Sequence, residues 1–424
     1  MTAYLADYAF LDGRVEGNVL ITVENGRIEK VEAQSAVRSE SRLPGLVLPG
    51  FANAHSHAFH RALRGRTHVG RGSFWTWRDL MYRVAATLDP DGYHRLARAV
   101  YGEMALAGIT AVGEFHYLHH GPDGTRYDDP NAMGHALIAA AKDAGIRITL
   151  LDTLYLTSGV DGRKPEGVQK RFSDGSLDAW ADRVGRLADD PHTRIGAAAH
   201  SVRAVPERDL SGLAGRHPLH IHLSEQPAEN EQCQAIHGCT PTELLRRNGV
   251  LGPATTVVHA THLTDDDVKA LHGTGVCFCP TTERDLADGI GPARTLADAG
   301  SPLSLGSDSH AVIDPFAEAQ GLEMDERLAS ERRGAFTAAE LIAAAANHGS
   351  IGWDDAGAIR AGNRADLVAV SLDSVRTAGA DPEQAVFAAT AADVTDVIVD
   401  GRPVVTGGAH TGFDVAAALR EAIA

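Results

Sequence analysis

An apolar run that ends in two histidines sets the frame for the whole chain: Val47-Leu48-Pro49-Gly50-Phe51-Ala52-Asn53-Ala54-His55-Ser56-His57. In an extended backbone, side chains two residues apart point to the same side. His55 and His57 are therefore placed to reach one metal ion, and neutral imidazole is a common zinc ligand. A buried strand whose end carries two polar residues is the simpler alternative, and the spacing alone does not separate the two.

The size and composition of the chain indicate a large soluble globular protein. It has 424 residues, of which 44% are hydrophobic and 22% charged, which suits a large domain with a smaller companion. No apolar run approaches the roughly 20 residues of a membrane span, and the first residues lack the pattern of a secretory signal. The net charge of −17 argues against nucleic acid or an anionic membrane as the main partner. We expect a cytoplasmic protein.

The four cysteines occur as two close pairs, Cys233 with Cys239 and Cys277 with Cys279. They are too few and too clustered for a disulfide framework. A four-cysteine zinc site is conceivable, but the second pair lies in an apolar stretch that is typical of a strand. We expect buried, reduced thiols.

Both ends of the chain show a pattern of short β-strands. Residues 18–23 and 27–31 are apolar stretches on either side of Asn25-Gly26, and Asn-Gly is a strong hairpin signal. Near the other end, residues 365–371, 394–399 and 402–405 are further strand candidates. We predict one small β-sandwich domain formed by residues 1–48 and 361–424, with a larger domain, residues 49–360, inserted between its halves.

The middle of the chain alternates short apolar runs with longer helical stretches, as in a parallel sheet wrapped by helices. Helical segments are expected at residues 92–107, 131–144, 177–188, 241–247, 265–272 and 315–329. Eight strand candidates in about 260 residues predict an α/β fold, a (β/α)8 TIM barrel. These strands are expected at residues 47–54, 110–115, 147–152, 194–199, 219–223, 255–259, 275–279 and 302–306.

Polar side chains gather where these strands end, which is where barrel enzymes place their active sites. They are His55 and His57 on the first strand, residues 114–117 on the second, His200 on the fourth, residues 220–225 on the fifth, His259 and His262 on the sixth, and residues 307–310 on the eighth. One histidine after an apolar run is unremarkable. Histidines and carboxylates after nearly every other strand are hard to explain by packing, so we predict a single metal centre in the barrel mouth.

This combination of histidines and carboxylates at the ends of strands far apart in the sequence resembles the amidohydrolase superfamily. The residues that carry the resemblance are His55-Ser56-His57, His222, His259, Asp308 and residues 357–368, where the chain leaves the barrel. The resemblance covers nearly the whole chain, and it implies a barrel with a β-domain split between the two chain ends.

The number of metal ions can be predicted from the absence of a lysine at the end of the fourth strand. Binuclear members of the superfamily bridge two ions with a modified lysine at the end of strand four, and residues 195–200 of this chain contain no lysine. We predict one Zn²⁺ per subunit, although nitrogen and oxygen ligands also suit ferrous iron. The predicted ligands are His55, His57, His222 and Asp308.

The spacing His222-x-x-Glu225 places a carboxylate just beyond the fifth strand. There Glu225 would take a proton from water and deliver it to a leaving nitrogen, as related deaminases do with this pattern. The alternative is a surface glutamate in a loop. His259 would orient or polarise the nucleophile, and Asp308 would share in proton transfer. These residues predict hydrolytic deamination, in which water adds to a C=N carbon and ammonia departs.

The segment after His57 is rich in arginine. Six arginines and one acidic residue, Asp79, give it a local charge of +5 (six minus one): Arg61, Arg64, Arg66, Arg71, Arg78 and Arg83. Arg203 follows the fourth strand. Guanidinium groups bind carboxylates with two donors, so we predict a small anionic substrate. The alternative, pairing with acidic groups elsewhere, is expected for most of the six.

More narrowly, the chain resembles the formimidoylglutamate deiminase family in four blocks, residues 74–82, 114–119, 200–205 and 279–283. The resemblance implies hydrolysis of N-formimidoyl-L-glutamate to N-formyl-L-glutamate and ammonia, in histidine breakdown. It also implies that the glutamate carboxylates are held by Arg78, Tyr117, His200 and Arg203. Relatives can carry glutamine where this chain has His60, so His60 either replaces that contact with the formimino group or faces away.

Two other functions remain open. A purine or related heterocycle deaminase would use the same metal chemistry, but such sites favour stacking aromatic residues, and these are only 5% of this chain. A catalytically silent barrel acting as a scaffold would have lost a ligand or Glu225, and all are present. We also expect a homodimer, and a lid formed by one of two glycine-containing segments, residues 70–73 or 158–167.

Overall fold

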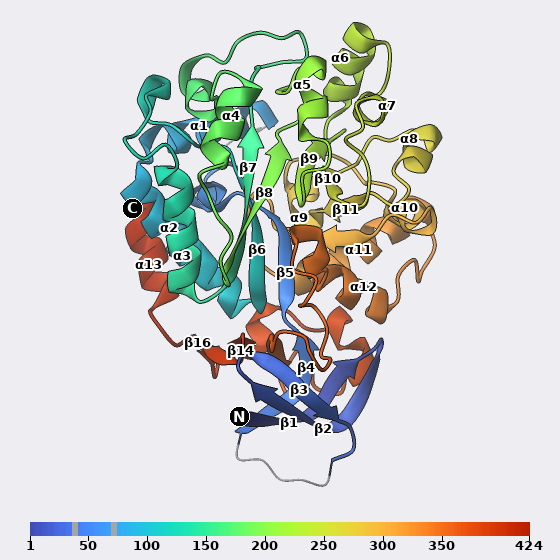
Figure 1. Cartoon of the computed structure of the whole chain (residues 1–424). Helices are drawn as coiled ribbons and strands as arrows, with labels where there is room; N and C mark the ends of the chain where they lie inside the picture. Colours follow the sequence, from blue (N-terminus) through green and yellow to red (C-terminus); the bar gives the residue numbers. More distant parts are fainter. Residues whose placement is uncertain (36–40, 69–73) are drawn as a thin grey trace.

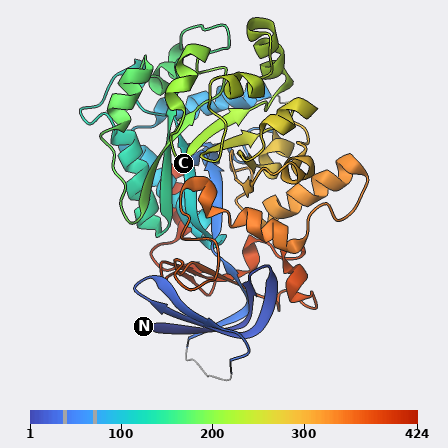
Figure 2. The same cartoon turned by 45° about the vertical axis from the view of Figure 1, so that its right-hand side comes forward.

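The computed structural model describes residues 1–35, 41–68 and 74–424, which form a barrel and a smaller β-domain beneath it (Figure 1). The N-terminus lies in the small domain, and the last helix returns to the side of the barrel. A view turned by 45° shows the same division into two parts (Figure 2). Among the described helices, none combines the length and the apolar character needed to cross a membrane.

Eight parallel strands form the barrel and pair in the order of the sequence. They are β5 (Phe51–Ser56), β6 (Ile109–His116), β7 (Arg147–Leu154), β8 (Thr193–Ala199), β9 (Leu219–Leu223), β10 (Thr255–His259), β11 (Gly275–Phe278) and β12 (Leu303–Leu305). The residues after β12 return to β5: the Asp308 N–H donates to the His55 carbonyl at 3.0 Å, and the His57 N–H donates to the Asp308 carbonyl at 3.3 Å. The prediction of a (β/α)8 barrel is confirmed.

The first predicted strand, residues 47–54, is wrong in its extent. The structure divides it between β4 (Ser41–Pro49), which belongs to the small domain, and β5, which begins at Phe51. Gly50 joins the two, and a Cβ atom there would lie 2.5 Å from the side chain of Thr110 and 2.9 Å from that of Asp366. Only glycine fits this crossing, because any side chain would collide with both neighbours.

The helices surround the barrel, and the six predicted ones are all present. The α-helices are α1 (Phe74–Thr87), α2 (Pro90–Leu106), α3 (Ala132–Ala144), α4 (Leu177–Val184), α5 (Glu207–Leu210), α6 (Pro227–His237), α7 (Pro241–Arg247), α8 (Asp265–Ala270), α9 (Pro280–Asp285), α10 (Ala293–Asp298), α11 (Pro315–Ser330), α12 (Ala338–Ala345) and α13 (Val415–Ile423). Two of them, α4 and α8, end earlier than expected. The last helix, α13, packs against α2 on the outside of the barrel.

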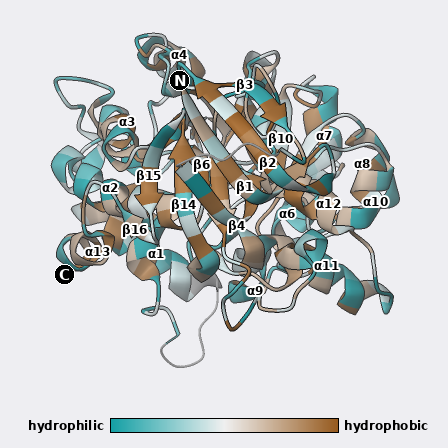
Figure 3. Ribbon diagram, turned by 90° about the horizontal axis from the view of Figure 1, so that it is seen from below, coloured by the Kyte–Doolittle hydropathy of each residue, from teal (hydrophilic) through white to brown (hydrophobic). Residues whose placement is uncertain are grey.

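The small domain unites both ends of the chain in one hydrogen-bonded sheet, with the order β16-β15-β14-β13-β4-β1-β2-β3. Its strands besides β4 are β1 (Thr2–Leu11), β2 (Arg14–Glu24), β3 (Arg27–Glu32), β13 (Leu367–Val370), β14 (Val394–Val399), β15 (Arg402–Thr406) and β16 (Ala409–His410). Seen from below, hydrophobic and hydrophilic segments alternate along these strands (Figure 3). They bury a core of their own, separate from that of the barrel. The prediction of a β-domain built from both chain ends is confirmed.

The cysteines behave as the sequence predicts. All four are buried and free, with no disulfide among them. They contribute apolar packing rather than a metal site.

Candidate metal centre and active site

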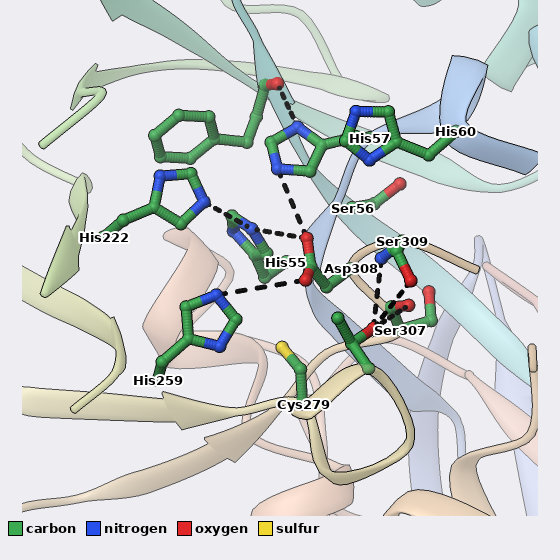
Figure 4. A network of polar contacts seen from close by, with 12 residues as sticks. His55, Ser56, His57, His60, His222, His259, Cys279, Ser307, Asp308 and Ser309 are labelled. Carbon is green, nitrogen blue, oxygen red and sulfur yellow. Dashed lines mark hydrogen bonds and ion pairs between the residues drawn. The ribbon is translucent and has the colours of Figure 1, made fainter. Parts of the chain in front are cut away.

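Four polar side chains converge at the carboxyl end of the barrel, two from strands β5 and β9 and two from the segments that follow β5 and β12 (Figure 4). Their ligating atoms all lie within 4.8 Å of one another, and the residues are His55, His57, His222 and Asp308. Asp308 Oδ1 lies 3.3 Å from Nε2 of His55 and 3.3 Å from Nε2 of His57. His222 Nε2 lies 3.1 Å from His55 Nε2. The residues that the sequence predicts as ligands are thus brought together.

The protonation of the imidazoles suits a metal. His57 Nδ1 lies 3.0 Å from the Phe115 carbonyl, and His222 Nδ1 lies 2.7 Å from the His200 carbonyl. Because a carbonyl can only accept, these Nδ1 atoms carry the hydrogen and Nε2 presents a lone pair. Burial lowers the pKa of all three histidines, that of His55 to about 3. Three neutral imidazoles, two of them fixed by backbone carbonyls, form together with one carboxylate a donor set that fits zinc.

The backbone around these residues is held in unfavourable conformations. Positive φ angles occur at Ser224 (50°), His259 (71°), Asp308 (38°) and His310 (58°), none of which is glycine. Such conformations cost free energy and concentrate at functional sites. Gly306 shows how closely the elements approach, because a Cβ atom there would lie 2.8 Å from the Cβ of His55. The fold therefore fixes the position of Asp308 against the first strand.

His259 and Glu225 lie beside the four ligand residues. His259 Nε2 lies 3.9 Å from Asp308 Oδ2 and 4.0 Å from Glu225 Oε1. Its Nδ1 lies 3.3 Å from Glu283 Oε1. Burial alone would lower the pKa of His259, but the hydrogen bond to Glu283 and the charges of Glu225 and Asp308 raise it well above its ordinary value. The Glu283 carboxylate thus fixes the His259 ring through Nδ1 and leaves Nε2 facing Glu225 and Asp308.

Glu283 is the functional partner that the sequence analysis missed. It lies in the distinctive block of residues 279–283, but nothing in that pattern links it to His259. The barrel brings them together, because Glu283 lies on α9, which follows β11, and His259 ends the neighbouring strand β10. The carbonyl partners of His57 and His222 could not be predicted from the sequence, because every residue has a backbone carbonyl and none is distinguished by residue type.

A cavity of about 710 Å³ opens above this cluster. Every predicted site residue lines it except His55, which is fully buried beneath: His57, His60, Arg78, Tyr117, His200, Arg203, His222, Glu225, His259 and Asp308. Of the two segments expected to form a lid, residues 158–167 contribute Ser158, Gly159 and Arg163 to the cavity wall. Residues 70–73 lie outside the described part of the chain.

The predicted substrate-binding residues are held by one another and by acidic neighbours. His60 Nε2 lies 2.9 Å from the Tyr117 hydroxyl, and the His60 and His57 rings are 4.6 Å apart. The Arg203 guanidinium lies between two carboxylates, with Nη2 3.3 Å from Glu225 Oε2 and Nε 3.0 Å from Glu229 Oε2. Arg203 therefore lines the cavity and also forms an ion pair with Glu225, the predicted proton acceptor.

The arginine-rich segment contributes less to the cavity than its charge suggests. Arg61 and Arg64 both pair with Glu103, and Arg66 donates to the Ile423 carbonyl. Among the described arginines of the segment, Arg78 lines the cavity. The alternative reading, pairing with acidic groups elsewhere, is thus correct for Arg61 and Arg64. Arg71 lies outside the described residues.

Strand β6 separates polar residues that the sequence places together. The Phe115 ring lies 5.1 Å from that of His55, and the Tyr117 ring lies 5.2 Å from that of His57, so both face the cluster. The alternate residues face outward, toward the helix layer. Glu114 accepts from the Ser56 hydroxyl at 2.6 Å and from the Ala58 N–H at 2.7 Å. It supports the loop that follows the first strand instead of lining the cavity.

The chain belongs to the amidohydrolase family, which it matches over residues 46–404, and it is therefore a hydrolase. It is 36% identical to formimidoylglutamate deiminase of Pseudomonas aeruginosa, over 97% of this chain and 96% of that protein. It is 29% identical to 8-oxoguanine deaminase of the same organism, over 94% and 92%. The structure of an amidohydrolase from Brucella melitensis is similar, with a TM-score of 0.89 at 31% identity over 100% and 99% of the two chains. A zinc-bound adenosine deaminase from Xanthomonas campestris shares the fold, with a TM-score of 0.85 at 23% identity over 99% and 96%.

Proposed function

We propose that this protein hydrolyses N-formimidoyl-L-glutamate to N-formyl-L-glutamate and ammonia, a step of histidine breakdown. The observation that carries the proposal is one cavity lined by both a His/Asp cluster and several arginines, among them Arg78 and Arg203. The cluster suits hydrolysis of a C=N bond, and the arginines suit a substrate with carboxylates. The similarity to a formimidoylglutamate deiminase along almost the whole chain supports the same substrate.

The residues that would hold the metal are His55, His57, His222 and Asp308, and we propose one Zn²⁺ per subunit. Zinc supplies a Lewis acid that makes water a stronger nucleophile near neutral pH. The surroundings of Asp308 keep its carboxylate ionised and able to bind a cation. Burial would raise the pKa of Asp308, but the hydrogen bond to His55 and the surrounding histidines lower it well below its ordinary value, so Asp308 is ionised.

Glu225 is the proposed proton acceptor and donor. Its carboxylate lies next to His259 and is oriented by Arg203. It takes a proton from the attacking water as oxygen adds to the amidine carbon, and then gives that proton to the departing nitrogen. The remaining O–H proton of the tetrahedral carbon passes through Asp308 to the same nitrogen, so this nitrogen receives both protons of the water. The C–N bond then breaks and ammonia leaves, while the carbon keeps the oxygen as a formyl group.

His259 and Asp308 complete the proposed chemistry. The protonated Nε2 of His259 can donate to oxygen as negative charge develops on it. Asp308 Oδ2, 3.9 Å from His259 Nε2, faces the same position and shares in proton transfer. Glu283 holds the imidazole of His259 from behind, as a positioning residue.

The remaining residues hold the substrate in the proposal. Arg78 and Arg203 would bind its carboxylates, together with Tyr117 and His200, which line the same cavity. His60 is proposed to take the position of the glutamine in relatives, since its ring lies against His57 and Tyr117 at the reacting end.

Release of ammonia tests the proposal directly. The metal-loaded protein should release ammonia from N-formimidoyl-L-glutamate far faster than from 8-oxoguanine, guanine or adenosine. The heterocycles are the right comparison because aromatic rings also line the cavity, among them Trp77, Tyr117 and Phe172, and because one relative is an 8-oxoguanine deaminase. Rapid turnover of a heterocycle without activity on the amidine would replace the proposal with that second function.

A further inference from the structure

Three side chains from different elements meet at the wall of the cavity. Tyr82 lies on α1, Tyr155 follows β7, and Gln169 lies on the short helix η3 (Gly167–Phe172). The Gln169 amide nitrogen donates to both tyrosyl oxygens, at 3.1 Å to Tyr82 and 2.9 Å to Tyr155. None of the three has a role in the metal cluster or in the proton transfers described above.

The orientation of the Gln169 amide follows from its other contact. Its Oε1 accepts from the Glu166 N–H at 3.4 Å, in a capping box at the start of η3. Its nitrogen must therefore face the tyrosines, and each of its two hydrogens serves one phenol oxygen. Since both phenols act as acceptors toward Gln169, their own hydrogens point elsewhere. Among the described residues, neither hydroxyl donates a hydrogen bond to the protein.

Both phenols are held firmly and stay protonated. The buried Phe172 ring packs against them, with ring centroids 6.2 Å from Tyr82 and 5.5 Å from Tyr155. The Arg78 guanidinium lies over the Tyr82 ring, 5.5 Å from its centroid. Burial raises the pKa of both tyrosines, against the opposing charges of Arg78 and Arg203. Two fixed O–H donors therefore line the cavity close to the Arg78 guanidinium.

The position of this pair relates it to one end of the substrate. The Tyr155 ring lies 5.0 Å from the His200 ring, which in turn lies 5.2 Å from the ring of the ligand residue His222. This series of contacts leads away from the metal cluster and toward Gln169 and Tyr82. The pair therefore belongs to the part of the cavity that receives the group farthest from the reacting carbon.

We propose that Tyr82 and Tyr155, oriented by Gln169, form a two-donor subsite for the side-chain carboxylate of an acidic substrate, and so select substrates that carry this second carboxylate. The identity of the substrate rests on the proposed function. The subsite itself requires only a carboxylate at that distance from the reacting group.

Binding of the product gives a test that does not depend on turnover. N-formyl-L-glutamate and N-formyl-L-norvaline, which has a methyl group in place of the side-chain carboxylate, are titrated into the metal-loaded protein by calorimetry. Tyr82→Phe and Tyr155→Phe should each raise the Kd of N-formyl-L-glutamate about tenfold, the effect of losing one hydrogen bond to a charged group. Their Kd for the norvaline compound should stay within about twofold of the wild type.

A third variant tests the role of Gln169. In Gln169→Glu, a carboxylate accepts the phenol hydrogens and turns them away from the substrate, so the Kd should rise at least as much as in the tyrosine variants. Tyr8→Phe, which removes an exposed hydroxyl on β1 far from the barrel mouth, is the matched control and should change neither Kd. Equal weakening for both ligands, or no change with either, would overturn the subsite.

Kinetics with N-formimidoyl-L-glutamate separate this inference from the proposed function. The tyrosine variants should raise KM about tenfold with kcat within about threefold, because the hydroxyls bind substrate and transition state equally. A wild-type protein without activity on this amidine, but with the predicted loss of binding in the variants, would remove the proposed function and retain the subsite. An active wild type with unchanged KM in both variants would retain the proposed function and remove the subsite.

Discussion

Two buried groups of histidine and aspartate lie close together in the barrel, and they differ in what surrounds them. One is His55, His57, His222 and Asp308, and the other is His116, His119 and Asp152. In both groups the candidate ligand atoms lie within 4.8 Å of one another. Three of the four residues of the first group line the cavity, whereas no member of the second does.

In the second group, the negative charge of Asp152 is already neutralised by a protein side chain. Asp152 accepts from both terminal nitrogens of Arg183 at 2.7 Å and from Trp180 Nε1 at 3.0 Å. His119 Nε2 lies 2.9 Å from the Thr153 carbonyl, so this nitrogen carries a hydrogen. In the second group, the buried guanidinium of Arg183 supplies the positive charge that a metal ion would supply. Residue type and distance therefore do not make a metal site, and the partners of each nitrogen and carboxylate decide.

The largest expected effect separates the two groups by metal content. His222→Ala should lose the bound metal and reduce kcat/KM at least about a thousandfold, because the Lewis acid contributes several kcal/mol to the transition state. Metal analysis and ammonia release on the same sample measure both effects. The native protein should contain one zinc per chain.

His119→Ala is the matched variant in the second group. It removes an equally buried imidazole, and it should retain one zinc per chain. Two zinc ions in the native protein, with one lost in each variant, would show that both groups bind metal and would remove the distinction between them.

Removing the charge of Asp152 should mainly affect stability. Asp152→Asn leaves the buried Arg183 paired with Asp174 alone, and should lower the free energy of unfolding at pH 7 by about 3 kcal/mol. Burial would raise the pKa of Asp152, but the charge of Arg183 lowers it overall. A carboxylate with a lowered pKa stabilises the fold above its ordinary pKa of 3.8, and this stabilisation is lost as the pH falls below it.

Denaturant unfolding at pH 7 and pH 3 measures this change. The difference between wild type and Asp152→Asn should shrink at the lower pH, while zinc content stays the same in both. Loss of zinc from folded Asp152→Asn would place the residue in a metal site after all.

The barrel and the shared β-domain could be predicted from sequence because each depends on a local pattern. The four converging ligand residues were selected among the polar strand ends by the resemblance to the amidohydrolase superfamily. Strand ends are visible in apolar runs, and parallel strands bring their ends together. The division at Gly50 was missed because residues 47–54 form one apolar run with no internal signal of a change of sheet. Alternation along β6 could have placed Glu114 and His116 outside the cavity, since Phe115 and Tyr117 face the cluster. The pairing of Arg61 and Arg64 with Glu103 depends on tertiary structure alone.

Glu225→Gln tests the chemistry of the first group while leaving its ligands intact. The amide cannot take the proton from water, so kcat should fall about a hundredfold, and the zinc content should not change. Comparison with His222→Ala then separates loss of proton transfer from loss of metal. A normal kcat in Glu225→Gln would assign the proton transfer to Asp308 or His259.

The smallest expected effect concerns Glu114, which supports the first group from the outer side of β6. Burial raises its pKa to about 7, although the Ser56 hydroxyl and the Ala58 N–H donate to it and oppose this shift. The folded protein therefore binds this proton more tightly than the unfolded chain, whose carboxyl has an ordinary pKa of 4.5. Stability from this residue is fully present below that value, and it falls as the pH rises toward 7, by at most about 1.4 kcal/mol per pH unit for one proton.

Glu114→Gln removes this titration, because its amide stays neutral while its oxygen still accepts a hydrogen bond from Ser56 or Ala58. Chemical unfolding of both proteins at pH 5, 6, 7 and 8 should show that the wild type loses stability relative to the variant up to about pH 7 and runs parallel to it above. The slope should be the same with and without zinc if Glu114 acts only on the loop after β5. A slope that disappears when zinc is bound would instead connect Glu114 electrostatically to the metal centre, and would make β6 a shared element of both buried groups.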